Sequence, residues 1–160
     1  MTDKIDKKKA SGRRYQDYVI QDGRLVGDFE GMYQNASEVP WHQDATANAI
    51  FSDITIAIIK HFRVTSLLDI GCGLGYMAER MRREIPDLKR VVGIDISETA
   101  IQEAQKMFPH IEFRAGTPET LDTPERFEVV CSKDVLWYVI PHIREYLAAL
   151  VKHSTKWVYI

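Results

Sequence analysis

From about residue 64 onward, short apolar runs alternate with stretches of helical periodicity. The runs are apolar at successive positions, which is typical of strands buried on both faces of a sheet. Strands that alternate with helices predict an α/β fold with a doubly wound, mostly parallel sheet and helices on both faces. The expected strands are Val64–Ile70, Arg90–Asp95, Ile111–Ala115, Phe127–Ser132 and Trp157–Ile160.

Helix signals fill the intervals between these runs. Ser97 is a good N-cap residue for the helix after the second strand, and Pro109 ends that helix. Pro141 suits the first turn of a later helix. Apolar residues at helical spacing also predict an amphipathic helix over Thr46–Phe62 and another over Tyr76–Glu84.

The N-terminal part differs in character from the rest. Six basic and two acidic residues occupy the first fourteen positions, which predicts a disordered basic tail over residues 1–22, with a phosphate-seeking arm as the alternative. Residues 23–62 are expected to form an irregular lid segment and a helix. Residues 63–160 then form the α/β core.

Composition excludes several classes of function. The chain has 160 residues, enough for one domain, and its net charge of −2 with a pI near 6.2 argues against a nucleic-acid partner. Cys72 and Cys131 have no metal or disulfide spacing. Without a signal peptide or a long apolar run, no membrane partner is expected and the protein is predicted to be cytoplasmic.

The stretch D-I-G-C-G-L-G-Y, Asp69–Tyr76, follows the first strand and holds three glycines. Such a loop suits a dinucleotide pyrophosphate, a nucleoside or only a tight turn. Gly71 and Gly73 fit the dinucleotide pattern G-x-G-x-x-G, but Tyr76 stands where the third glycine belongs. NAD is therefore disfavoured, although an NAD-dependent oxidoreductase remains an alternative.

Two acidic residues narrow the choice of ligand. Asp69 precedes the loop, where a carboxylate suits a positively charged ligand better than two phosphates. Asp95 ends the second strand, 20 residues after Gly75, and can accept both hydroxyls of a ribose. The combination predicts a nucleoside ligand that carries a positive charge.

The chain from about Thr46 to Ile160 resembles the class I S-adenosylmethionine-dependent methyltransferases. The resemblance rests on V-T-S-L-L-D-I-G-C-G-L-G-Y, V-V-G-I-D-I-S, I-E-F-R-A-G-T-P-E-T-L and F-E-V-V-C-S-K-D-V-L-W-Y-V. It implies a Rossmann-like sheet with strand order 3-2-1-4-5 and S-adenosyl-L-methionine as cofactor, with S-adenosyl-L-homocysteine as product. Thr117 stands where the family often has an acidic residue for the adenine.

The resemblance also implies roles for individual residues. The loop from Gly71 through Cys72 and Gly73 to Gly75 would cradle the methionine part of the cofactor with its amides, together with Asp69. Asp95 would take the ribose hydroxyls and Ile96 would lie on the adenine. The turn at Thr117 and Pro118 would edge the adenine, and Ser132 and Lys133 would border the sulfonium.

The acceptor side is less well defined by the sequence. Tyr33 and Trp41 belong to a segment that more weakly resembles the lids of small-molecule methyltransferases acting on sugars or saccharide conjugates. Tyr33 would close on the methionine end. His42, Asp134 and His142 are the candidate general bases for a small-molecule acceptor. A non-catalytic binding module is the alternative to an enzyme.

The family usually has seven strands, whereas this sequence reaches only the fifth. An uncovered apolar edge strand favours association. We therefore expect either a chain truncated after the fifth strand or a natural short form that pairs through this edge as a homodimer.

Overall fold

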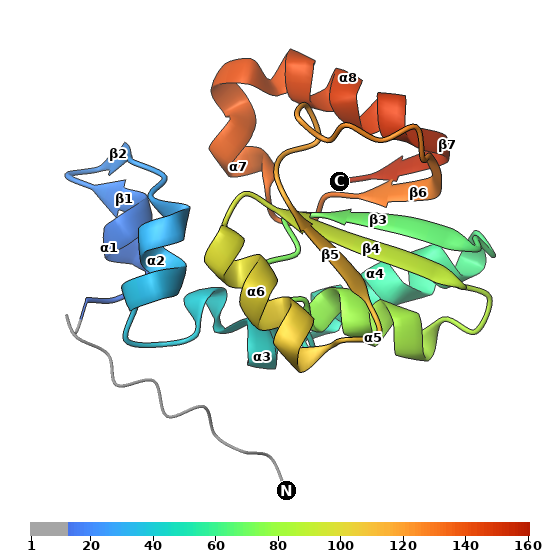
Figure 1. The fold of residues 1–160 in the computed structure, drawn as a ribbon, viewed down its shortest axis with the longest axis horizontal. Coiled ribbons are helices and arrows are strands. Elements are labelled where there is room, and N and C mark those ends of the chain that lie inside the picture. The colour runs from blue at the N-terminus through green and yellow to red at the C-terminus, as the bar shows by residue number, and fades with distance from the viewer. Residues whose placement is uncertain (1–12) are drawn as a thin grey trace, which may run out of the picture.

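The computed structural model describes residues 13–160, and its centre is a five-stranded parallel sheet (Figure 1). The strand order β5-β4-β3-β6-β7 is the predicted order 3-2-1-4-5, so the doubly wound fold is confirmed. Asp69 of β3 pairs with Gly93 of β4 and with Cys131 of β6. The strands are β3 Ser66–Ile70, β4 Arg90–Asp95, β5 Glu112–Ala115, β6 Phe127–Cys131 and β7 Ser154–Tyr159.

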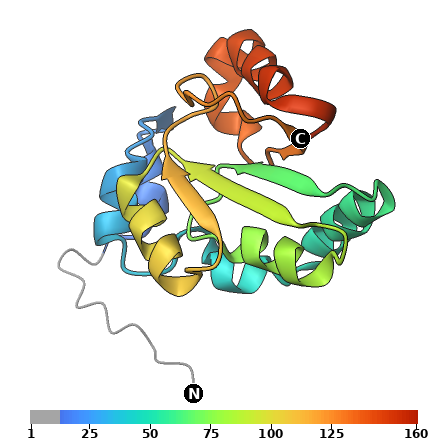
Figure 2. The same cartoon turned by 45° about the vertical axis from the view of Figure 1, so that its right-hand side comes forward.

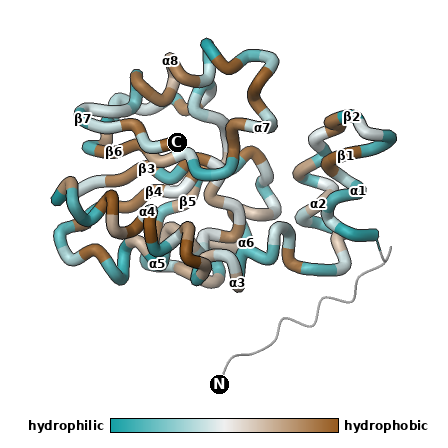
Figure 3. Tube along the Cα trace, turned by 180° about the vertical axis from the view of Figure 1, so that it is seen from behind, coloured by the Kyte–Doolittle hydropathy of each residue, from teal (hydrophilic) through white to brown (hydrophobic). Residues whose placement is uncertain are grey.

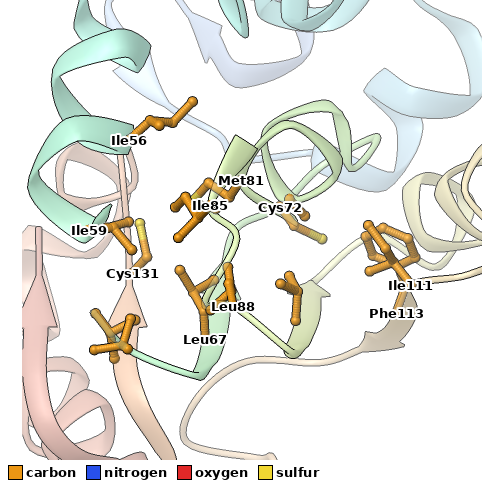
Figure 4. Close-up of a cluster of buried hydrophobic side chains, with 14 of the residues drawn as sticks. Ile56, Ile59, Leu67, Cys72, Met81, Ile85, Leu88, Ile111, Phe113 and Cys131 are labelled. Carbon is orange, nitrogen blue, oxygen red and sulfur yellow. The ribbon is translucent and has the colours of Figure 1, made fainter. Parts of the chain in front are cut away.

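Helices cover both faces of the sheet, as Figures 1 and 2 show. Successive strand residues point to opposite faces, so Leu67 packs in one core and Leu68 in the other. Figure 4 shows the first core, where Leu67 lies among Ile59, Met81 and Ile85. The helices of this face are α4 Ile50–His61, α5 Tyr76–Glu84 and α6 Glu98–Met107; α7 Leu136–Val139, the 3₁₀ turn Ile140–His142 and α8 Ile143–His153 cover the other.

Residues 13–22 contain a helix and a strand, whereas the sequence predicted a disordered tail over residues 1–22. Residues 1–12 of that predicted tail lie outside the part of the chain that the structure describes. Helix α1 spans Gln16–Val19, and strands β1 (Ile20–Gln21) and β2 (Arg24–Leu25) form a hairpin. Tyr18 and Val19 are buried in a third cluster with residues of α2 (Phe29–Asn35). The excess of basic residues is therefore confined to the first fourteen positions, and the apolar side chains that follow it are packed against the rest of the protein.

The N-terminal elements α1, β1, β2 and α2 lie at one end of the sheet, where α2 contacts α6 (Figures 1 and 3). The predicted N-cap is confirmed, because Ser97 Oγ accepts a hydrogen bond from the Ala100 amide. The same hydroxyl donates to Glu30 of α2 over 2.6 Å, and Glu30 also accepts from the Thr99 amide. This carboxylate joins the lid segment to the start of α6.

The segment before α4 is irregular, as expected. It contains the 3₁₀ turn Pro40–His42 and the short helix α3, Gln43–Thr46. Trp41 and His42 both have left-handed backbone conformations, with φ of 51° and 49°. Helix α4 begins only at Ile50, because Ala49 is extended and breaks the helix predicted from Thr46.

The outer edge of β7 has no strand partner among residues 13–160. Trp157 of this strand stacks on Phe62, with ring centroids 4.6 Å apart, and Phe51 and Ile160 are exposed. Pairing of this edge with a second copy stays a prediction. No helix within the described residues is long and apolar enough to cross a membrane.

Candidate nucleoside-binding site

A cavity of about 570 Å³ lies beyond the carboxyl ends of strands β3, β4, β5 and β6. This is the end of a doubly wound sheet where ligands collect. Side chains from the lid segment and from the loops after these strands line it together. The predicted site residues that line the cavity are Tyr33, Trp41, Asp69, Gly71, Cys72, Asp95, Ile96, Thr117, Pro118, Lys133, Asp134 and His142.

Asp69 lines this cavity, and one oxygen of its buried carboxylate has no hydrogen-bond partner among the described residues. The residue is only 4% exposed, and its Oδ2 has no hydrogen-bond partner in the described structure. Burial raises the pKa of Asp69 to about 7, against a lowering effect of Lys133 and a further raising effect of Asp95. A buried carboxylate with an unsatisfied oxygen favours a cationic or hydrogen-bond-donating ligand.

Asp95 is also buried, but both of its oxygens are held by the backbone. Oδ2 accepts from the Gly73 amide and Oδ1 from the Ser97 amide, each over 2.9 Å. Burial raises the pKa of Asp95, and these two hydrogen bonds oppose the shift. Each carboxylate oxygen has further acceptor capacity. Asp95 therefore presents a fixed acceptor to the cavity, as its predicted role toward two ribose hydroxyls requires.

The amides of the glycine loop, expected from the sequence to cradle the methionine part, have acceptors within the protein. The amides of Gly71 and Cys72 both donate to the Ile94 carbonyl, and that of Gly75 donates to the Cys72 carbonyl. The Gly73 amide is held by Asp95. Protein acceptors therefore already occupy these donors, and neither Gly73 nor Gly75 lines the cavity. Gly71 and Cys72 do line it, and the binding role of the loop stays a prediction.

The glycines of the loop are explained by close packing of the protein's own groups. A Cβ at Gly71 would collide with the Val135 side chain, and one at Gly73 would collide with the Gln43 amide. A Cβ at Gly75 would lie 2.6 Å from the ring of Phe113. All three glycines also have positive φ values, from 53° to 81°, which side chains rarely adopt.

The end of the cavity assigned to adenine is formed by Ile96 and the turn after β5. Ile96 is an exposed apolar residue on the cavity wall. The Thr117 hydroxyl is hydrogen-bonded to that of Thr120, so it stabilises the turn. His153 is buried, and its Nε2 lies 2.8 Å from the Pro118 carbonyl oxygen, which fixes the turn from the opposite side.

Ser132 and Lys133 occupy different environments although they are adjacent. Ser132 is fully buried, its hydroxyl is paired with that of Tyr146 over 2.6 Å, and it does not line the cavity. The side chain of Ser132 is therefore not part of the cavity wall, and its expected place beside the ligand stays a prediction. Lys133 lines the cavity and forms an ion pair with Asp134.

Aromatic side chains form one wall of the cavity. Trp41 is at the centre of this wall, with its ring centroid 6.1 Å from that of Tyr138 and 6.2 Å from those of Phe29 and Tyr33. Tyr138 also meets Phe29 edge to face, with centroids 5.2 Å apart. The lid segment and α7 thus meet through aromatic contacts over the cavity.

The structure separates the three candidate bases. His142 and Asp134 line the cavity. His42 does not, because the left-handed turn at Trp41 and His42 leaves its exposed ring edge-on to Tyr15. His42 is therefore not placed to reach a ligand in this cavity.

Sequence reasoning missed Gln43, which lines the cavity and contacts both the glycine loop and Tyr33. No group of three or more histidine, cysteine or acidic side chains among residues 13–160 could hold a metal ion.

The fold is a Rossmann-like α/β domain with a cavity at the carboxyl ends of its parallel strands. The chain belongs to the methyltransferase domain family, whose model matches residues 67–156.

Two curated relatives are ubiquinone biosynthesis O-methyltransferases. The protein of Rhodopseudomonas palustris (strain BisB5) is 37% identical over 92 residues, which are 54% of this chain and 35% of the relative. That of Pelagibacter ubique (strain HTCC1062) is 34% identical over 112 residues, covering 62% and 43%. The chain therefore spans less than half the length of these relatives.

Solved structures share the fold at lower identity. DesVI of Streptomyces venezuelae superposes with a TM-score of 0.61 at 19% identity, over 72% of this chain and 50% of that one. CalS10, an S-adenosylmethionine-bound amino pentose methyltransferase from Micromonospora echinaspora, gives 0.60 at 20% identity, over 74% and 52%. The N-methyltransferase NodS of Bradyrhizobium japonicum in complex with S-adenosyl-L-homocysteine gives 0.58 at 24%, over 75% and 63%.

Proposed function

We propose that this chain binds S-adenosyl-L-methionine and serves the transfer of its methyl group to a small molecule. The observation that carries the proposal is that two buried acidic residues line the same cavity: Asp69, whose Oδ2 has no hydrogen-bond partner among residues 13–160, and Asp95, whose carboxylate is held by backbone amides. One carboxylate suits a positive charge and the other suits ribose hydroxyls. Membership of the methyltransferase domain family supports the same cofactor.

The residues of the cavity fit the parts of this cofactor. Asp69 would hold the ammonium group of the methionine part, and Asp95 would accept from the ribose hydroxyls. Ile96 and the turn at Pro118 offer the apolar surface that an adenine ring needs. Lys133, already paired with Asp134, limits the negative potential around Asp69.

The cofactor supplies an activated methyl group, so the protein's task is alignment and proton removal. Alignment of two reactants is worth on the order of 7–11 kcal/mol. A hydroxyl or amine acceptor must also lose a proton. His142 and Asp134 are the cavity-lining groups that would take it.

A sugar or saccharide conjugate is the acceptor that we propose first. Phe29, Trp41 and Tyr138 give the cavity broad apolar faces, against which the C–H face of a sugar ring can pack. The same lid segment carries the resemblance to sugar-modifying methyltransferases, and an amino pentose methyltransferase shares the fold. A ring hydroxyl of an aromatic compound is the second candidate, because the curated relatives are named as O-methyltransferases of ubiquinone biosynthesis.

The test is a transfer assay with S-adenosylmethionine carrying a labelled methyl group. The acceptor panel contains amino-sugar nucleotides, neutral glycosides and phenols, and the Asp95→Ala variant is the inactive control. Transfer to a sugar of the panel supports the first proposal, and transfer to phenols alone supports the second. Tight cofactor binding without transfer to any acceptor would contradict catalysis and favour the non-catalytic binding module.

A further inference from the structure

Gln43 of α3 bridges the glycine loop and the lid segment. Its Oε1 accepts a hydrogen bond from the Leu74 amide over 2.8 Å, and its Nε2 donates to the Tyr33 hydroxyl over 2.9 Å. A backbone N–H can only donate, so the oxygen of the Gln43 amide must face Leu74. The orientation of the side chain is therefore fixed by the loop, and its nitrogen must face Tyr33.

This orientation decides the role of the Tyr33 hydroxyl. Its oxygen accepts from Gln43, so its own hydrogen points elsewhere, and no acceptor for it is found among residues 13–160. Tyr33 is 6% exposed and lines the cavity. Burial, and then the charge of Asp95, raise the pKa of Tyr33 well above 10, so the hydroxyl keeps its proton. Tyr33 is thus a donor with an unused hydrogen in the cavity wall.

The methionine part of the cofactor has an ammonium group and a carboxylate. Asp69 suits the ammonium, but the carboxylate needs a donor in a cavity that already contains two buried carboxylates. The amides of Gly71, Cys72, Gly73, Leu74 and Gly75 are all engaged by protein acceptors. Lys133 is paired with Asp134.

Tyr33 stands directly over the glycine loop. Its hydroxyl oxygen lies 2.6 Å from the position that a Cβ at Gly73 would take. We propose that Gln43 is a positioning residue that directs the Tyr33 hydroxyl hydrogen toward the carboxylate of the methionine part. This inference rests on the proposed cofactor and adds a residue that selects for the amino-acid end of that cofactor.

Two ligands separate this role from a merely structural one. S-adenosylhomocysteine contains the whole amino-acid end, whereas 5′-methylthioadenosine keeps the adenosine and the sulfur but lacks the ammonium and the carboxylate. Loss of the Tyr33 donor should weaken only the first ligand. Loss of loop structure should weaken both.

The experiment measures both dissociation constants by calorimetry for the wild type, Gln43→Leu, Tyr33→Phe and the double variant. Gln34→Leu is the matched control, because Gln34 is an exposed glutamine of α2. We expect Gln43→Leu and Tyr33→Phe each to weaken S-adenosylhomocysteine roughly tenfold or more, as for a lost hydrogen bond to a charged group. Binding of 5′-methylthioadenosine should change less than about twofold, and the double variant should bind no more weakly than Tyr33→Phe by the same margin.

Equal weakening of both ligands by Gln43→Leu, or independent additive losses in the double variant, would overturn the inference. Gln43→Met keeps the length of the side chain without its amide and should behave as Gln43→Leu does. It replaces Gln43→Leu in the experiment if the protein with that branched side chain does not fold. A wild-type protein that binds neither ligand would contradict the proposed function itself. If only the role of Gln43 is wrong, the wild-type protein still binds S-adenosylhomocysteine.

Discussion

The Gly73 amide donates a 2.9 Å hydrogen bond to Oδ2 of Asp95, which joins the loop after β3 to the end of β4. The two elements are neighbours in the sheet, since Ile70 pairs with Ile94. The backbone amide of Gly73 therefore holds the Asp95 carboxylate in place, and the carboxylate in turn orders the loop. Changes at Asp95 should affect the ligand and the loop together.

Asp95→Ala should weaken binding of S-adenosylmethionine by roughly 1.5–3 kcal/mol, because it removes charge-assisted hydrogen bonds to the ribose. Calorimetry measures the effect. Asp87→Ala is the matched control, since Asp87 is exposed in the turn before β4. An unchanged affinity in Asp95→Ala would refute the ribose role.

Binding of the cofactor should depend on pH through Asp69. The pKa of Asp69 is about 7 because the residue is buried, and a bound cation favours its ionised form. Binding below pH 7 must therefore release a proton, and the affinity should fall roughly tenfold from pH 8 to pH 6. Calorimetry at both pH values, in two buffers of different ionisation enthalpy, measures the affinity and the proton release.

Asp69→Asn is the control for this pH dependence. It should bind more weakly than the wild type at pH 8, and its affinity should hardly change down to pH 6. A wild-type affinity that is flat between pH 6 and pH 8 would contradict the assignment of the ligand's positive charge to Asp69.

The same carboxylate should reduce the stability of the ligand-free protein above neutral pH. Its pKa in the folded state lies above the usual 3.8, so the folded state binds the proton more tightly than the unfolded state does. Its contribution to the free energy of unfolding is therefore most favourable below pH 4 and is lost as the pH rises through 7. Asp69→Asn should raise the free energy of unfolding at pH 8, by up to about 4 kcal/mol at 1.36 kcal/mol per pKa unit.

Urea denaturation at pH 4.5 and pH 8 measures this difference. The gain from Asp69→Asn should be much smaller at the lower pH. A variant that is less stable than the wild type at pH 8 would show that the negative charge supports the fold.

His142 and His42 should differ sharply in their effect on turnover. His142 lines the cavity, whereas His42 is turned toward Tyr15 outside it. If the acceptor loses its proton to His142, His142→Gln should lower kcat by about 10²–10⁴, and His42→Gln should leave it within about twofold. The reverse pattern would place the base in the lid segment. Asp134→Asn tests the other cavity-lining candidate in the same assay.

Gly71→Ala should destabilise the fold by about 1–3 kcal/mol. The backbone φ of Gly71 is 74°, and an added Cβ would collide with Val135. Denaturant unfolding of Gly71→Ala and of the double variant Gly71→Ala/Val135→Ala separates the two causes. The double variant should relieve the collision and retain the backbone strain. If Gly71→Ala no longer lowers the free energy of unfolding when Val135→Ala is already present, backbone strain is not a cause of the destabilisation.

The parts of the site that follow strands could be predicted from the sequence. Asp69 and Asp95 each end an apolar run, and the carboxyl ends of adjacent parallel strands meet at one edge of the sheet. Their place at the ends of two adjacent strands therefore brings both carboxylates to the same edge of the sheet. Ile96 and Lys133, whose roles the family resemblance implied, also line the cavity.

Contacts between distant irregular segments could not be predicted in this way. Gln43 reaches Leu74 across 31 positions through a turn with left-handed residues, and no periodicity marks it. The acceptors that the amides of the glycine loop find at Ile94 and Asp95 are set by the packing of β4, and the sequence does not mark them. The pairing of the Ser132 hydroxyl with that of Tyr146 on α8 could not be predicted either, because the two residues belong to different elements.

Calorimetric titration of this chain with S-adenosylmethionine, S-adenosylhomocysteine and NAD in parallel tests the proposed cofactor most directly. Both sulfur nucleosides should bind at one site, and NAD should show no comparable binding, because Tyr76 stands where the dinucleotide pattern has its third glycine. Binding of NAD without binding of either sulfur nucleoside would contradict the central claim.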